Sequence, residues 1–363
     1  LDVLLFFMWE GVDGKVSAAI FHTEILGLTA VHAAESGGCI QGAAAAGIIE
    51  LDAPDFFGNG FVGNMYLEGT NRSLQVDVGG GSVCRYAQPA VIMDLTVEAE
   101  AFGADVHFTE DAVPAVIGHL LNDADDIKAL KVPSLKAARV PEYLKANLLS
   151  ARAINDRPVL GGCIGPFSLA GRLYDMSEIM VLIYQNPDAA HTLLAKCTEF
   201  ILKYCKALKM TGVDGVVMAE PAAGLMSDDD CKRFSSDYIR YIVGQVQDDS
   251  FSIVLHNCGN TGHCTKAMVA TGAAAYHFGN KCDMRQVIKD VPPTALAMGN
   301  IDPVSVFKEG TPEQMYETTT RLLQEMKEYP NFVLSSGCDT PPHTPMENID
   351  AFFKALDDFD KTI

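Results

Sequence analysis

A histidine and two cysteines hold the positions in this sequence where zinc chemistry is expected. His256 and Cys258 directly follow the apolar run 251–255 (FSIVL), and Cys338 follows a second run at 332–337 (FVLSSG). Residues two apart at a strand end point to the same side, so His256 and Cys258 can both reach one ion. One imidazole and two thiolates form a zinc set that leaves a fourth position for water or substrate. The wide separation of Cys338 from the pair is typical of a catalytic site rather than a structural finger.

The alternative is that these three residues have no metal-binding role. A His-x-Cys pair alone is a weak signal, because Cys258 could be a packed thiol and His256 a hydrogen-bonded core histidine. The cysteine at a second strand end is the feature that favours a metal site.

The elements that must position these residues alternate between strand and helix. Asn186-Pro187-Asp188 predicts a capped helix start, and apolar residues then recur at helical spacing until Gly212. The segments 311–314 (TPEQ) and 344–347 (TPME) predict two further capped starts. Short apolar strands are expected at 104–108, 158–163, 213–219, 251–255, 273–278, 294–298 and 332–335.

Repeated strand-then-helix units predict an α/β fold with a parallel sheet, and continuous apolar strands indicate burial on both faces. The number of units favours a (β/α)₈ TIM-type barrel. The region before about residue 90 lacks this rhythm and is rich in glycine and alanine. We therefore predict a single domain, with residues 1–90 as an N-terminal elaboration and residues 91–363 as the main barrel.

Other candidate site residues follow the predicted strands, where barrels of this type build their sites. Glu220 is expected to be a catalytic pocket acid or to hold the zinc histidine in place, and a solvated carboxylate is the alternative. Gly165, Asn300 and Asp302 are candidates for cofactor binding. Asp302 precedes a proline and could equally cap the helix that follows.

Composition excludes several classes of function. The chain has 363 residues with 27 basic and 47 acidic side chains, so its formal net charge is −20. Such a surface repels nucleic-acid phosphates and disfavours anionic membranes. No segment reaches the roughly 20 apolar residues of a membrane span. Ten cysteines without a recurring paired spacing indicate a reducing, cytoplasmic compartment.

Five segments carry a family resemblance: 92–103 (IMDLTVEAEAFG), 162–167 (GCIGPF), 256–261 (HNCGNT), 298–303 (MGNIDP) and 335–342 (SSGCDTPP). They resemble the uroporphyrinogen decarboxylase superfamily, and within it the branch of methylcobalamin:coenzyme M methyltransferases and related corrinoid-dependent methyltransferases. The resemblance extends from about residue 89 to the C-terminus.

The resemblance implies a zinc-dependent methyltransferase. In that branch a His-x-Cys pair and a distant cysteine bind zinc, and His256, Cys258 and Cys338 match those positions. A methyl group would move from a corrinoid (cobalamin) carried by a partner protein to a small thiol such as coenzyme M, or to a pterin. The branch often adds a carboxylate after the His-x-Cys strand, but no acid stands there. His277, Cys282 or water could fill the fourth position, while the two side chains could equally be buried core residues.

Two other functions stay open. Uroporphyrinogen decarboxylases use no metal and carry an N-terminal arginine-rich segment with a Gln-Ala-Gly-Arg-Tyr core, which this sequence lacks. A non-catalytic barrel that binds a corrinoid, a tetrapyrrole or a partner protein is the third alternative. Asp339 could tune the charge of the adjacent Cys338 or act as a cap, and a homodimer is a candidate assembly.

Overall fold

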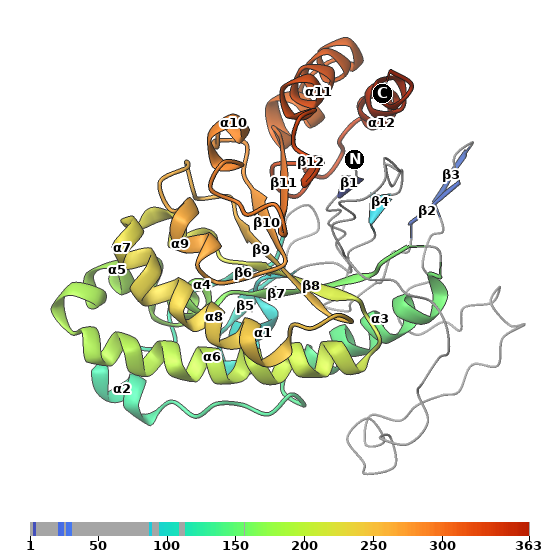
Figure 1. The fold of residues 1–363 in the computed structure, drawn as a ribbon. Helices are drawn as coiled ribbons and strands as arrows, with labels where there is room; N and C mark the ends of the chain where they lie inside the picture. Colours follow the sequence, from blue (N-terminus) through green and yellow to red (C-terminus); the bar gives the residue numbers. More distant parts are fainter. Residues whose placement is uncertain are drawn as a thin grey trace, which may run out of the picture.

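One eight-stranded parallel sheet organises the molecule (Figure 1). The computed structural model describes residues 94–108, 113–155 and 157–362, together with the backbone of four short strands before residue 90. The strands of this sheet are hydrogen-bonded in the order β4-β1-β12-β11-β10-β9-β8-β7. The strands are β1 Val3–Leu4, β4 Ala87–Gln88, β7 Leu160–Ile164, β8 Gly215–Ala219, β9 Ser252–Asn257, β10 Ala275–Phe278, β11 Leu296–Ile301 and β12 Phe332–Ser336.

Helices follow the strands, as the α/β prediction requires. They are α1 Val97–Phe102, α2 Ala124–Ala129, α3 Val140–Ala153, α4 Pro166–Tyr174, α5 Met176–Gln185, α6 Pro187–Met210, α7 Asp228–Cys231, α8 Asp237–Val246, α9 Thr265–Val269, α10 Met284–Val287, α11 Pro312–Met326 and α12 Met346–Asp360. A 3₁₀ turn, η3 (Pro221–Leu225), follows β8, and two π-helical turns, η4 (Lys232–Ser236) and η5 (Pro303–Lys308), precede α8 and follow β11. The long helix α6 packs on α8 and on α4, while α11 and α12 lie side by side (Figure 1).

The sheet separates two apolar layers. Its inner face carries alternate residues of neighbouring strands, which form a compact cluster: Leu160, Val217, Ala219, Val254, Ala275, Leu296, Met298 and Val333. The intervening residues, such as Ile253 and Leu334, pack outward into the larger core beneath the helices. Strands buried on both faces explain the continuous apolar runs of the sequence.

Two of the three predicted helix caps are confirmed. The Asn186 side chain accepts from the Ala189 amide at the start of α6, and the Thr311 hydroxyl accepts from the Gln314 amide at the start of α11. The cap expected at Thr344 is wrong, because its hydroxyl donates to the Pro341 carbonyl and α12 begins after Pro345 without a side-chain cap.

The N-terminal part of the chain needs one correction. The predicted strand at 104–108 is β5 (Val106–His107), which pairs antiparallel with β6 (Ala115–Val116) and does not join the parallel sheet. Within the predicted elaboration 1–90, β1 and β4 belong to the main sheet, and β2 (Phe21–Glu24) pairs antiparallel with β3 (Gly27–Ala30). The rest of that segment lies outside the described residues, so the boundary near residue 90 stays a prediction. Among the described helices, none has the length and apolar character to cross a bilayer.

Candidate metal centre

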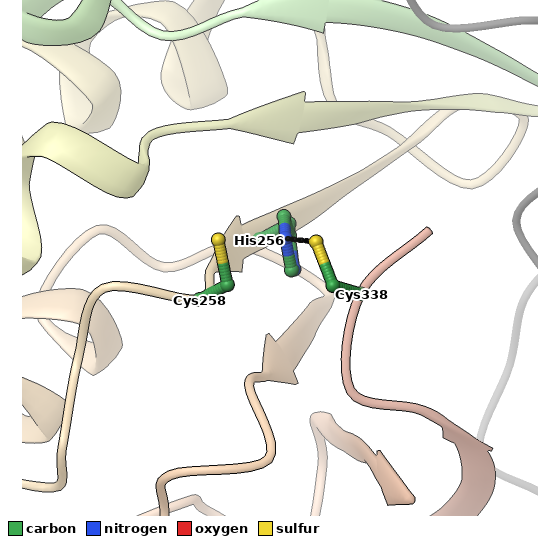
Figure 2. Close-up of side chains that lie close together, drawn as sticks. All are labelled: His256, Cys258 and Cys338. Atoms are coloured by element: carbon green, nitrogen blue, oxygen red, sulfur yellow. Dashed lines mark hydrogen bonds between the residues drawn. The ribbon is translucent and has the colours of Figure 1, made fainter. Parts of the chain in front are cut away.

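His256, Cys258 and Cys338 converge at the carboxyl edge of the sheet. His256 is the penultimate residue of β9, Cys258 directly follows that strand, and Cys338 lies two residues beyond the end of β12. One ligand atom from each side chain lies within 4.8 Å of the others. Figure 2 shows the three side chains pointing toward a common space between the two strand ends. In the part of the chain that the structure describes, no other group of this kind occurs.

The distance between His256 and Cys338 fits a tetrahedral zinc ion. The Nε2 atom of His256 lies 3.7 Å from the sulfur of Cys338. Bonds of about 2.0 Å to nitrogen and about 2.3 Å to sulfur at a tetrahedral angle would place those two atoms about 3.5 Å apart. His256 is buried while both cysteines are partly exposed, so the side of the site that carries the thiols is open to a ligand.

The two thiols perturb each other. The neighbouring thiol lowers the pKa of Cys258 and raises the pKa of Cys338, and burial raises the pKa of Cys338 further. Two thiols this close together can bind one cation in place of their protons, since metal binding to thiols releases protons. The donor set therefore suits a soft or borderline divalent ion such as zinc.

His277 lies behind the histidine of this set. It is fully buried, and the register of β10 and β9 pairs it with His256. Its Nδ1 atom lies 2.6 Å from Nδ1 of His256, and its Nε2 atom lies 3.0 Å from the hydroxyl of Ser335. Burial, together with the neighbouring imidazole, holds the pKa of His277 well below its usual value. Because both ring nitrogens are engaged, His277 could become a fourth ligand only by losing one of these contacts.

Cys282 and Asp339 are the other groups close to the centre. The Cys282 thiol donates to the Asn260 carbonyl at 3.0 Å, and burial raises its pKa to about 12. This hydrogen-bonded neutral thiol is poorly suited to be the fourth ligand. Burial also raises the pKa of Asp339 to about 6, while His256 partly opposes that shift. The carboxyl group beside Cys338 is therefore harder to ionise than that of an ordinary aspartate.

Glu220 and Gly165 lie next to each other, and the contacts of Glu220 at this position stabilise the fold. The fully buried Glu220 carboxylate accepts from the amides of Phe167 and Ser168 at the start of α4, each at 2.8 Å, and from the Ser235 hydroxyl at 2.8 Å. Burial raises the pKa of Glu220, and these hydrogen bonds oppose the shift. A Cβ atom at Gly165 would lie 2.3 Å from this carboxylate. Their catalytic and cofactor-binding roles stay predictions.

Asn300 and Asp302 organise the loops at the same edge of the sheet. The Asn300 amide donates to the carbonyls of Gly279 and Cys282 at 2.8 and 2.7 Å. One oxygen of Asp302 caps the turn η5 by accepting from the two amides at 304 and 305, and the other accepts from Asn280. The capping alternative for Asp302 is thus confirmed, while cofactor binding by either residue stays a prediction.

Sequence reasoning missed Ser335 and the position of His277 behind His256. The available signal was register. Each histidine stands one residue before the end of its strand, and β9 and β10 are consecutive parallel strands whose ends align.

The comparisons with known proteins agree with this geometry. The family model described as Uroporphyrinogen decarboxylase (URO-D) matches residues 86–359. The methylcobamide:CoM methyltransferase MtbA of Methanosarcina acetivorans is 30% identical over 274 residues, which are 74% of this chain and 79% of the relative. A uroporphyrinogen decarboxylase of Coxiella burnetii is 25% identical over 74% of this chain and 76% of its own.

A solved structure shows the same fold. The "methyltransferase from Methanosarcina mazei" superposes with a TM-score of 0.69 at 26% identity, over 75% of this chain and 80% of that one. The predicted α/β fold with a TIM-type parallel sheet is confirmed by this match and by the strand order.

Proposed function

The chain belongs to the uroporphyrinogen decarboxylase (URO-D) family, and from that premise we propose that it is a zinc-dependent methyltransferase. It would move a methyl group from a methyl-corrinoid protein to a small thiol such as coenzyme M, or to another acceptor such as a pterin. The observation that carries the proposal is the convergence of His256, Cys258 and Cys338 at the end of the sheet. The relative named as a methylcobamide:CoM methyltransferase supports the choice of donor and acceptor.

The three side chains would hold zinc and leave one position for the acceptor. Zinc in that site would lower the pKa of an acceptor thiol below its usual value of about 8.5, so that the sulfur reacts as a thiolate. A sulfur lone pair would then form the new bond to the methyl carbon, and the electron pair of the carbon–cobalt bond would stay with the corrinoid. The apolar inner face of the sheet closes the site from below, which keeps water out of that side.

We take three rim residues as candidates for the contact with a donor protein. Three exposed apolar side chains lie on segments that follow the carboxyl ends of the strands: Leu225 after β8, Val304 after β11 and Met346 after β12. They would let the corrinoid protein present its cofactor to the thiol side of the site.

The test is methyl transfer itself. Purified protein would be supplied with zinc, methylcobalamin and coenzyme M, and the loss of the methylcobalamin absorbance would be followed. We expect turnover in the wild type and a loss of at least about 100-fold in Cys258→Ser and Cys338→Ser. Cys197→Ser, which changes a buried thiol in α6, is the matched control and should keep its rate.

Decarboxylation is the outcome that would replace the proposal. The URO-D relative from Coxiella makes it the natural competitor. If the protein released carbon dioxide from uroporphyrinogen, and did so equally well after both cysteine substitutions, the methyltransferase assignment would be wrong.

A further inference from the structure

His277 connects the two strands that carry the metal ligands. Its Nδ1 atom contacts His256 on β9, and its Nε2 atom contacts Ser335 on β12, two strands away from β10 in the sheet. His256, His277 and Ser335 all continue the inner face of the sheet, two residues beyond Val254, Ala275 and Val333 of the inner cluster. All three are buried. The contact therefore spans the interior directly beneath the site formed by the three ligands.

The ring nitrogen of His256 that faces the site determines where the protons lie on both histidines. His256 faces Cys338 with Nε2, so Nε2 is the atom that would bind the metal, and it would then carry no proton. Its proton is then on Nδ1 and is donated to Nδ1 of His277 at 2.6 Å. The proton of His277 is consequently on Nε2, which donates to the hydroxyl of Ser335. One pair of tautomers is therefore compatible with both the contact between the two histidines and the contact with Ser335.

We propose that His277, supported by Ser335, is the positioning residue of the metal centre: it fixes His256 in the tautomer and ring orientation that present Nε2 to zinc. The inference rests on the proposed zinc site, but not on the identity of the methyl donor or acceptor. Histidine ligands usually donate their second ring N–H to a carboxylate, a carbonyl or water, and that partner raises the basicity of the ligand. Here a second imidazole occupies that position, and it also links β9 to β12.

A purely structural role for His277 makes a different prediction. A buried side chain that only fills volume is replaced best by an apolar residue of similar size, such as leucine. A positioning residue is replaced best by asparagine, because its side-chain oxygen can accept from His256 close to where Nδ1 does. Glutamine reaches toward Ser335 instead and lacks an acceptor at the position of Nδ1. The order of the three variants therefore separates the two roles.

The experiment measures metal affinity without any substrate. Zn²⁺ would be titrated into the full-length apo protein in competition with a chromophoric chelator, and Co²⁺ would be titrated separately to record the absorption bands of a tetrahedral site. We expect His277→Asn to bind Zn²⁺ within about fivefold of the wild type, and His277→Leu and His277→Gln to bind it 10- to 100-fold more weakly, the usual range for loss of such a partner. The Co²⁺ bands should shift in His277→Leu and stay close to wild type in His277→Asn.

Controls separate a local effect from a loss of folding. His191→Leu and His191→Asn change a histidine that contacts Tyr238 on α8, away from the centre, and both should keep the wild-type affinity. Ser335→Ala removes only the far end of the chain of contacts and should weaken Zn²⁺ binding severalfold. Should His277→Leu fail to fold, the comparison of asparagine with glutamine still decides the question.

Two results would overturn the inference. One is a His277→Leu variant that binds Zn²⁺ as tightly as the wild type, and the other is equal affinity in the asparagine and glutamine variants. Neither depends on turnover. A wild type that binds zinc but transfers no methyl group would remove the proposed function, while the ranking of the variants would still test the role of His277.

Discussion

A buried acid near the start of the described core gives the fold its own pH dependence. Glu98 on α1 accepts from the Ile164 amide with one carboxylate oxygen, and its other oxygen has no hydrogen-bond partner among the described residues. Burial raises the pKa of Glu98 to about 7. The folded protein therefore retains a proton on this group at pH values where the unfolded chain has already lost it.

The free energy of unfolding should fall as pH rises through this range. The pKa of Glu98 is about 7 in the folded protein and near 4.5 in the unfolded chain. The contribution of Glu98 to the free energy of unfolding is therefore fully present below about pH 4.5 and is lost as the pH rises through about 7. The total change is on the order of 3 kcal/mol. Glu98→Gln imitates the protonated form, so we expect a smaller fall between pH 5 and pH 8 by urea denaturation. An unchanged pH dependence in this variant would contradict the argument.

At this same scale, the sequence predicted the three residues that converge at the candidate metal centre, but not the side chains around them. His256, Cys258 and Cys338 were found because strand ends are readable from apolar runs and because ligand types are chemically restricted. His277 and Ser335 act through contacts between β10 and its neighbours, and a single chain does not show which residues of separate strands lie opposite each other. The hydrogen bonds of Glu220 to α4 were also not predicted, since their donors lie more than 50 positions away in the sequence.

At the scale of elements, Glu220 ties the end of β8 to the start of α4. The carboxylate occupies the space that a side chain at position 165 would need, as the 2.3 Å approach of a Cβ atom shows. We expect Gly165→Ala to displace it and to lower the free energy of unfolding by about 1–3 kcal/mol, because two buried amides would lose their acceptor.

Thermal denaturation of Gly165→Ala checks this expectation, with Gly244→Ala as the control because a Cβ atom at Gly244 meets nothing within 4 Å. If Gly165→Ala kept the wild-type midpoint, the carboxylate would not be held as the structure shows it.

The predicted elements succeeded where the signals were local. The caps of α6 and α11 depend on residues within three positions of each other, so the sequence indicates them directly. The strand at 106–107 was assigned to the wrong sheet because its pairing depends on β6, and β1 and β4 were not identified at all. Their places in the sheet are set by β12 and by each other, far along the chain.

At the scale of the whole molecule, substitutions of the rim residues test whether the methyl-corrinoid protein binds at this surface. We expect Leu225→Asp combined with Val304→Asp to raise the KM for the methyl-corrinoid protein about tenfold, because each substitution would bury an unpaired charge at the proposed contact. The reaction with free methylcobalamin provides the reference, because it needs no protein contact, and its rate should change little. An equal loss in both assays would show that the substitutions damage the site and not a docking surface.

The central claim is the metal centre, and the most direct measurement is the metal content of the purified protein. Elemental analysis of wild type prepared without chelator should find about one zinc per chain, the stoichiometry of a single tetrahedral site. The double variant Cys258→Ala, Cys338→Ala should contain almost none, while Cys197→Ala should match the wild type. A wild-type protein that contains no zinc, and takes up none when dialysed against a zinc salt, would contradict the account. The convergence of the three residues would then not reflect zinc binding.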